Sequence, residues 1–273
     1  MKTVRNVLVL SMVGICLIAC SSDETETESI NYKISAPTVN GKRLVKIKYG
    51  DEFTSIEYNS QGQVSKVKFH FKNGTSREDS YWYEDRRVIR SPYEFIYYLS
   101  DGYAVECKYT AQISDQSTIT VECQDTYSYD SKGYLVEAMM APYDFSEEGP
   151  FNEIYTYTWR DGNISHVIVT ESSENKILEE YDIKYTSIEN SIPLFFTYYY
   201  SNNEYLEWQG CFGKRSKNLP QSVTFINRTW VPSWDSNSHT YNYNYTFENG
   251  LITKISVESP TIKHMDIYEL EWW

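Results

Sequence analysis

The chain has 273 residues, with 25 basic and 38 acidic side chains and a formal net charge of −13. Because an acidic chain is repelled by phosphate backbones and no basic patch is visible in the sequence, we do not expect nucleic acid to be a partner. Hydrophobic residues make up 41% of the chain. This length and composition suffice for one large β domain, or two small ones, with a buried core.

The first predicted element is an export signal over residues 1–19. Two basic residues, Lys2 and Arg5, precede an apolar stretch that runs from Val7 to Ala19. This stretch is shorter than the roughly twenty residues that a helix needs to cross a bilayer core. A basic head, an apolar centre and a small residue before the cut are typical of a secretory signal peptide.

The signal ends in Leu17-Ile18-Ala19-Cys20, which resembles the lipobox of bacterial lipoproteins. The resemblance implies a diacylglycerol on the Cys20 sulfur, cleavage between Ala19 and Cys20, and a third acyl chain on the new amine. Several chains matter because a single acyl chain anchors a protein only marginally. The alternative is an ordinary signal peptide that is cut elsewhere, with Cys20 incidental.

Residues 20–30 are predicted to be the lipidated cysteine and a flexible tether. Residues 21–29 contain no hydrophobic side chain, a composition typical of disordered segments. The segment resembles the surface-export signal of Bacteroidetes lipoproteins, which implies an outer-membrane location facing the cell surface. A plain solvated spacer is the alternative. The acidic residues that would form the sorting signal are Asp23, Glu24, Glu26 and Glu28.

Residues 31–273 are predicted to form a single all-β domain, an elongated antiparallel meander of hairpins with few or no helices. The chain has 26 tyrosines, and aromatic residues fit the pleated, half-buried face of a sheet. Alternating apolar and polar residues recur, as in "VSKVKFHF" (64–71) and "YNYNYTF" (241–247). In "RLVKIKY" the alternation assigns Leu44 to one face and Ile47 to the other.

Short turn sequences separate these runs. Asn-Gly and Asp-Gly pairs between alternating runs are a strong hairpin signal, because glycine adopts positive φ without steric cost. The predicted turns are "NSQG" ending at Gly62, Asn73-Gly74, Asp101-Gly102, "DSKG" ending at Gly133, Asp161-Gly162 and Asn249-Gly250.

One hairpin unit repeats along the chain, most clearly as "YSYDSKGYLVEA" at residues 127–138. It resembles a degenerate YD repeat of Rhs-type surface proteins, and looser copies lie at 56–69, 155–169 and 243–257. "GKRSKNLPQSV" (213–223) resembles a motif of Bacteroidetes lipoproteins that carry a domain of unknown function. Between residues 86 and 126 the repeat is absent, so the strand register there stays open.

Three cysteines follow Cys20, so at least one is unpaired or joins another molecule. Cys107 and Cys123 flank the polar turn "QISDQST" and are candidates for a disulfide across a hairpin. Two buried thiols are an equally good interpretation. Cys211 has no C-x-x-C partner that would indicate a metal or redox site.

The sequence predicts no catalytic residues, no metal site and no cofactor. The four histidines are far apart, and no nucleophile elbow, zinc motif or phosphate loop is present. A glycosidase would need two carboxylates about 5 to 10 Å apart, and 38 acidic residues give no basis for choosing a pair. We therefore expect a protein that is not an enzyme, with glycosidase-like activity as the remaining alternative.

Two functions are compatible with these features. The first is a lipid-anchored surface protein that binds or scaffolds another protein, since repeated hairpins present broad faces and edges. The second is a carbohydrate-binding surface module in glycan capture. Trp230 and Trp234 in "TWVPSWDSNSH" (229–239) are its candidate site, because indole faces suit the apolar faces of sugars. The alternative is that both indoles cover a sheet edge.

Overall fold

The computed structural model describes residues 34–92, 94–112, 120–141, 152–193, 204–228, 238–260 and 264–273. Residues Asn31–Trp273 form one compact unit. Its described part contains β1 (Leu44–Tyr49), β2 (Glu52–Tyr58), β3 (Val64–His70), β4 (Ser76–Glu84), β5 (Arg87–Ser91), β6 (Phe95–Ser100), β7 (Tyr103–Gln112), β8 (Thr120–Tyr129), β9 (Leu135–Met140), β10 (Glu153–Arg160), β11 (Asn163–Glu171), β12 (Ile177–Glu189), α1 (Glu204–Trp208), β13 (Asn218–Asn227), β14 (Ser238–Glu248), β15 (Leu251–Ser259) and β16 (His264–Trp272).

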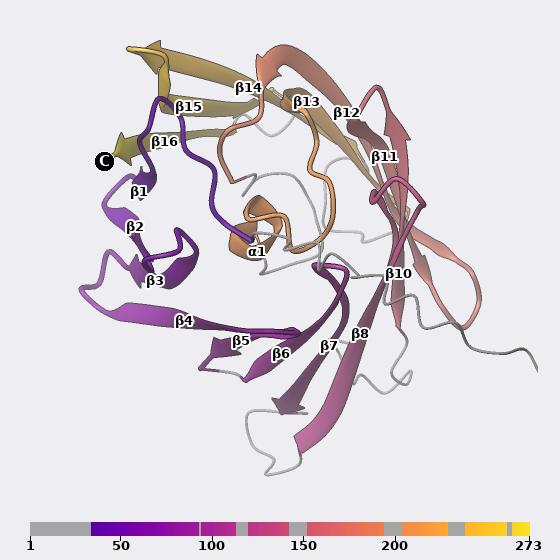
Figure 1. The fold of residues 1–273 in the computed structure, drawn as a ribbon. Coiled ribbons are helices and arrows are strands. Elements are labelled where there is room, and N and C mark those ends of the chain that lie inside the picture. The colour runs from indigo at the N-terminus through magenta and orange to yellow at the C-terminus, as the bar shows by residue number, and fades with distance from the viewer. Residues whose placement is uncertain are drawn as a thin grey trace, which may run out of the picture. The chain divides into compact units, whose positions relative to one another are not determined.

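The strands form one closed antiparallel barrel (Figure 1). Each strand pairs with the next in sequence, and β1 pairs with β16 to close the ring. The predicted all-β meander of hairpins with few helices is confirmed. The register that the sequence left open between residues 86 and 126 is now given by the pairing of β5, β6, β7 and the start of β8 over their described residues. Closure of the meander into a ring was not predicted, because pairing between the first and last strands has no local sequence signal.

Every predicted glycine turn lies between two strands, and each of these glycines has positive φ. All but the Asn73-Gly74 turn lie at one end of the barrel, which we call the turn end. The turn end comprises the connections 59–63, 85–86, 101–102, 130–134, 161–162 and 249–250. The backbone of Arg43, just before β1, bonds that of Trp273 here as well.

A β-bulge follows most of these turns and changes which residues face inward. In the hairpin of β8 and β9 the register shifts between Ser128 and Tyr129, so that Leu135 and Ala138 are both buried. A similar shift beside Leu44 buries both Leu44 and Ile47, so their predicted placement on opposite faces was wrong. The same spacing buries Val64 with Val67, Ala104 with Cys107, Ile164 with Val167, and Ile252 with Ile255.

Around the turn end, most neighbouring hairpins are joined by a hydrogen bond from an aromatic side chain of one hairpin to a backbone carbonyl of the next. The Tyr129 hydroxyl, at the end of β8, donates to the carbonyl of Ala104 at the start of β7, with an O–O distance of 2.6 Å. We call these contacts the aromatic latches. The others join Tyr58 to Leu44, Tyr83 to Val64 (2.8 Å), Trp159 to Leu135 (2.7 Å), Tyr245 to Pro220 (2.8 Å) and Trp272 to Ile252 (2.7 Å).

The connection between β12 and β13 turns into the barrel. Its described part from α1 to residue 217, which we call the inner segment, lies within the ring of strands (Figure 1). Trp208 and Phe212 are buried there, and the Phe212 ring meets those of Tyr97 and Tyr127 edge-on at 6.0 and 5.0 Å. A sixteen-stranded barrel is too wide for wall side chains alone to fill. The inner segment therefore completes the core.

The inner segment also bonds successive hairpins of the turn end. The Cys211 carbonyl accepts from the Ala104 amide (2.7 Å), and the Lys214 amide donates to the Gly133 carbonyl (2.8 Å). Further along, the Lys217 amide donates to Gly162 (2.9 Å). These bonds fix the inner segment to the wall over several hairpins.

We expect Tyr129→Phe to lower the free energy of unfolding by about 1 to 2 kcal/mol, because it leaves the Ala104 carbonyl without its hydroxyl partner. Tyr98→Phe is the matched control, since that tyrosine lies on the outer side of β6 and should change stability by less than about 0.5 kcal/mol. Chemical denaturation of both variants measures the difference. Equal stability of the two variants would contradict a structural role for the latch.

Candidate functional site

The wall of the barrel opens where β3 and β4 separate. Their pairing runs only from His70↔Ser76 to Lys66↔Ser80. Beyond that point, Tyr81–Glu84 continue along β5, whereas β3 bends away at the bulge beside Val64. The two strands therefore form a fork at the turn end, as neighbouring hairpins also do at β1 and β2 and at β7 and β8.

The inner segment closes the fork from inside. The Val64 amide donates to Oε1 of Gln209 at 2.8 Å, and Nε2 of Gln209 donates to the Tyr83 hydroxyl at 2.9 Å. The same hydroxyl donates to the Val64 carbonyl, so one latch belongs to this network. Gln209 is buried. Its network gives the fork a rigid floor.

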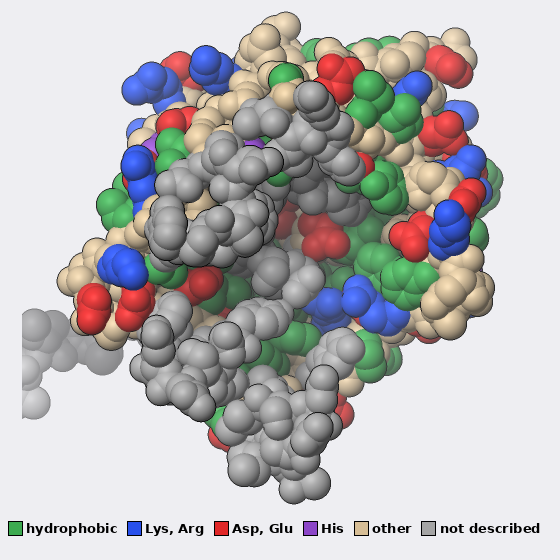
Figure 2. Space-filling model, turned by 180° about the vertical axis from the view of Figure 1, so that it is seen from behind, with side chains coloured by type: hydrophobic (Ala, Val, Ile, Leu, Met, Phe, Trp, Pro, Cys, Tyr) green, Lys and Arg blue, Asp and Glu red, His purple; other side chains and the backbone are tan. Residues whose placement is uncertain are grey.

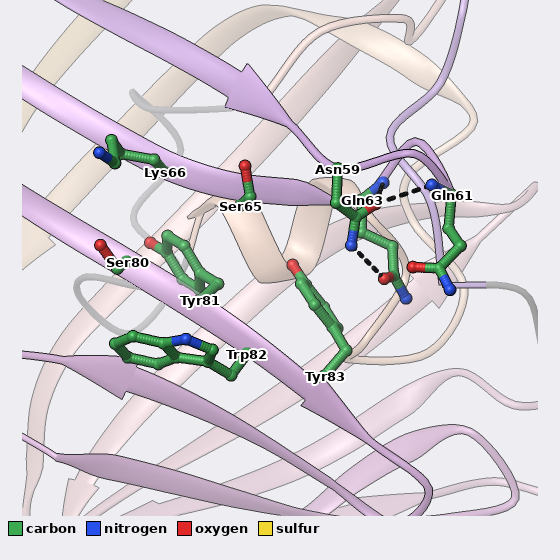
Figure 3. A pocket seen from close by; sticks show the side chains of 9 residues that line it. All are labelled: Asn59, Gln61, Gln63, Ser65, Lys66, Ser80, Tyr81, Trp82 and Tyr83. Carbon is green, nitrogen blue, oxygen red and sulfur yellow. Dashed lines mark hydrogen bonds between the residues drawn. The ribbon is translucent and has the colours of Figure 1, made fainter.

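In front of this floor lies a pocket of about 400 Å³, which we call the fork pocket (Figure 3). Trp82, on the outer side of β4, is 52% exposed, a large value for an indole. Polar side chains from β3, β4 and the turn before β3 line the rest of the pocket. The lining residues are Asn59, Gln61, Gln63, Ser65, Lys66, Ser80, Tyr81, Trp82 and Tyr83.

Some of these polar groups serve the fold and others remain available. Asn59 holds the turn, because its Oδ1 accepts from the amides of Gln61 and Gln63, both at 3.0 Å. Ser65 and Ser80 present hydroxyl groups on the two arms of the fork (Figure 3). Burial raises the pKa of Tyr81, so it remains a neutral hydroxyl at physiological pH. Apart from Lys66, which is paired with Glu78, the pocket thus offers uncharged donors and acceptors beside one exposed aromatic face.

Inside the barrel the ionisable groups are buried. Asp79 and Arg90 form an ion pair, with Nη2 of Arg90 2.8 Å from Oδ2 of Asp79. Burial raises the pKa of Asp125 to about 6, although its Oδ1 accepts from the Ala141 amide at 2.8 Å. Burial likewise raises the pKa of Glu207, in α1, to about 7.

Two carboxylates also face the interior from β10 and β12, which flank β11. Glu153 accepts from the Tyr155 hydroxyl at 2.9 Å, and Glu179 accepts from Tyr181. Burial, and to a smaller extent the charge of Glu153, raises the pKa of Glu179. Each carboxylate is thus held by a tyrosine on its own strand. Within the described ranges, no group of His, Cys, Asp and Glu residues could hold a metal ion.

The outer face of the barrel wall carries charged side chains (Figure 2), and several of them form ion pairs between neighbouring strands. A wall that faces lipid instead needs an apolar band about 25 Å tall, and a lysine at the bilayer midplane costs roughly 2 to 4 kcal/mol. The cross-strand pairs are Lys46–Glu271 (2.9 Å), Lys48–Glu269 (3.3 Å) and Lys66–Glu78 (3.1 Å), and Lys108–Glu106 (2.9 Å) lies within β7. Separately, none of the helices that the structure describes is long and apolar enough to cross a membrane.

Most of the site residues predicted from the sequence lie outside the described residues. This applies to Ala19 and Cys20, to the acidic residues of the tether, and to Trp230 and Trp234. His239, at the end of the tryptophan-containing segment, is buried on β14 opposite Phe225.

The suggested disulfide is not formed, and Cys107 and Cys123 each keep a buried thiol. The register of β7 and β8 explains this, because Cys107 lies opposite Asp125 and Cys123 lies opposite Tyr109. The two cysteines are diagonal neighbours on the inner face, and diagonal positions are too far apart for a disulfide without backbone movement.

The fork pocket was not predicted from the sequence. The signal was present in "SYWYE" (80–84), where alternation places Trp82 and Ser80 on the face opposite Tyr81 and Tyr83. Two tyrosines facing the core imply that the tryptophan between them faces solvent. The fork itself could not be predicted, because it depends on where pairing between β3 and β4 ends.

Two solved structures share this fold. A porin-like protein from Bacteroides uniformis aligns with a TM-score of 0.59 and 17% identity over 88% of this chain and 99% of that one. A porin-like protein from Bacteroides vulgatus aligns with a TM-score of 0.59 and 13% identity over 84% of this chain and 97% of that one. At this level of identity the likeness establishes the fold alone. No protein-family model matches the sequence, and no curated protein matches it.

We expect the free energy of unfolding to depend on pH because of Asp125. Its pKa in the folded protein, about 6, lies above the unfolded value of about 4, so its stabilising contribution is complete below pH 4 and is lost as pH rises through 6. Asparagine resembles the protonated form. Asp125→Asn should therefore gain roughly 2 kcal/mol relative to the unmodified protein between pH 4 and pH 7.

The measurement is urea denaturation across this pH range. Asp130→Asn is a control of opposite sign, because the Tyr134 amide, foremost among several hydrogen bonds and charges, lowers the pKa of Asp130. Asp130→Asn should lower the free energy of unfolding at neutral pH, where Asp130 is charged, and leave it unchanged at acidic pH, where Asp130 is protonated. A constant difference between Asp125→Asn and the unmodified protein over the whole range would contradict the assignment.

Proposed function

We propose that this protein is a lipid-anchored, non-catalytic binding module at the surface of the outer membrane, and that its fork pocket binds carbohydrate. The observation that carries the proposal is the 52% exposed indole of Trp82 beside the amides and hydroxyls of the pocket. Carbohydrate sites combine an aromatic face with a small number of placed polar groups.

The chemistry of the fork pocket fits a sugar ring in two respects. The Trp82 face would cover the apolar C–H face of the ring, while Ser65, Ser80 and Gln61 exchange hydrogen bonds with its hydroxyl groups. Its volume of about 400 Å³ is within the usual range for small-molecule sites. The rigid floor at Gln209 lowers the entropy lost on binding, because the pocket is already formed.

The location is proposed from the lipobox together with the composition of the barrel wall. The fold is shared with porin-like proteins, yet ion pairs such as Lys46–Glu271 face outward where a spanning barrel would face lipid. We infer that the barrel stands outside the bilayer and that acyl chains on Cys20 hold it there. The acidic residues from Asp23 to Glu28 would then direct export to the cell surface.

Binding or scaffolding of another protein remains the alternative function. The ion-paired outer wall differs from a typical protein interface, whose centre is depleted of charged residues. The fork pocket, in contrast, has the size and polarity suited to a small polar ligand. The carbohydrate hypothesis is therefore the one that the geometry favours.

We expect the protein to bind one class of glycan on an array, and Trp82→Ala to weaken that binding at least tenfold through loss of the stacking face. Trp273→Ala is the matched control. It removes an indole that is 87% exposed but lies outside the pocket, and it should leave binding unchanged. Isothermal titration with the glycan found on the array measures both variants.

Three outcomes are informative. Equal binding by Trp82→Ala and the unmodified protein would exclude the fork pocket as the site. Loss of binding in Trp230→Ala or Trp234→Ala instead would support the site predicted from sequence. No binding to any glycan would contradict the carbohydrate hypothesis and favour a protein partner.

A further inference from the structure

A second pocket lies at the turn end, beside the start of β13, and has a volume of about 350 Å³. One side of it is supplied by four consecutive polar residues, three of them cationic: Lys214-Arg215-Ser216-Lys217. This is part of the "GKRSKN" stretch of the inner segment. The remaining lining residues are Tyr134, Gly162, Glu189 and Asn190.

The cations of this pocket form no ion pair with a carboxylate among the described residues, although Asp130 lies near enough to Lys214, and buried Glu207 near enough to Arg215, for their charges to interact. No carboxylate oxygen within the described ranges lies within ion-pair distance of Lys214, Arg215 or Lys217. Nη1 of Arg215 is buried without a hydrogen-bond partner there. Glu189 also lines the pocket, so three positive charges face one negative charge. This local excess contrasts with the net charge of −13 for the chain.

The backbone holds these cations in place. The amide of Lys214 is bonded to Gly133 at 2.8 Å, and the amide and carbonyl of Lys217 are bonded to Gly162 and Asn190 at 2.9 and 2.8 Å. Gly213, just before the cluster, passes so close to the wall that a Cβ there would lie 2.6 Å from the Gly133 carbonyl oxygen. The Lys214 ammonium lies 5.0 Å from the centre of the Tyr134 ring. The cluster is therefore a fixed feature of the turn end.

We infer that the turn-end pocket binds a phosphate group, through the ammonium groups of Lys214 and Lys217 and the guanidinium group of Arg215. Guanidinium and ammonium groups are the usual protein partners of phosphate oxygens. The phosphate could belong to a lipid headgroup or to a soluble phosphate ester, which present the same oxygens.

The path of the chain favours the lipid source. The first described residues join the barrel at the turn end, where the Ala36 amide donates to the Gly62 carbonyl at 3.1 Å and Asn40 donates to the Asn249 carbonyl at 3.3 Å. An anchor at Cys20, part of the proposed function, would tether this end of the barrel. A phosphate site here would then orient the barrel on the membrane and leave the other end exposed.

The test uses the double variant Lys214→Gln/Lys217→Gln, which keeps a polar side chain at each position and removes two charges. Lys184→Gln/Lys254→Gln is the matched control, because both lysines are exposed on the barrel wall outside the pocket. Binding to vesicles of phosphatidylcholine with one fifth phosphatidylglycerol is measured by co-sedimentation, using protein without the lipid anchor. Binding of inorganic phosphate is measured by isothermal titration.

We expect the first double variant to bind anionic vesicles about 25-fold more weakly than the unmodified protein, because each cation near an anionic surface contributes about fivefold. The control variant should bind as the unmodified protein does, and inorganic phosphate should compete. Binding of inorganic phosphate without vesicle binding would support the pocket and assign a soluble source. Equal losses in both double variants, or no binding of either probe, would overturn the proposal. We expect neither double variant to change glycan binding at Trp82. A negative result for phosphate binding is therefore distinguishable from failure of the carbohydrate hypothesis.

Discussion

The aromatic latches are the interaction on which the rest of the structure depends. Beyond each turn-end bulge the neighbouring hairpins separate, and a buried carbonyl at the start of a strand loses its pairing partner. A tyrosine hydroxyl or tryptophan N–H from the adjacent hairpin satisfies that carbonyl, as Tyr129 does for Ala104 and Trp159 for Leu135. Repeated around the ring, this bond joins separate hairpins into one closed barrel and accounts for the recurrence of tyrosine before the turns.

Closure creates a second requirement, because a ring of sixteen strands encloses more space than its wall can fill. The inner segment meets it with buried Trp208 and Phe212, and its backbone bonds the same hairpins that the latches join. Most apolar residues of the barrel therefore face inward, together with a few buried ionisable groups such as Asp79 and Arg90, and the cross-strand ion pairs face outward. This arrangement has the opposite polarity to that of a water-filled channel in a membrane, although the strand topology resembles that of porin-like proteins.

The sequence predicted the elements that depend on local chemistry. Alternation and Asn-Gly or Asp-Gly turns located the hairpins correctly, because strand period and positive φ are local properties. Closure, the bulge that buries Leu44 with Ile47, and the fork at Ser80 depend on pairing between distant segments. For the same reason the sequence could not decide whether Cys107 and Cys123 form a disulfide. Their diagonal register follows from the strand pairing and not from their spacing along the chain. Trp82 was accessible to sequence reasoning, but the cleft beside it was not.

We propose that this barrel, with a mainly apolar interior and a charged outer wall, stands outside the bilayer, and that acyl chains on Cys20 are what anchor it in the membrane. The most direct measurement replaces residues 1–20 with an ordinary cleavable signal peptide and follows the exported protein by fractionation without detergent. The account predicts a soluble, protease-resistant protein whose circular dichroism is rich in strand. Recovery of the folded protein only in the membrane fraction, resistant to extraction at high pH, would contradict it.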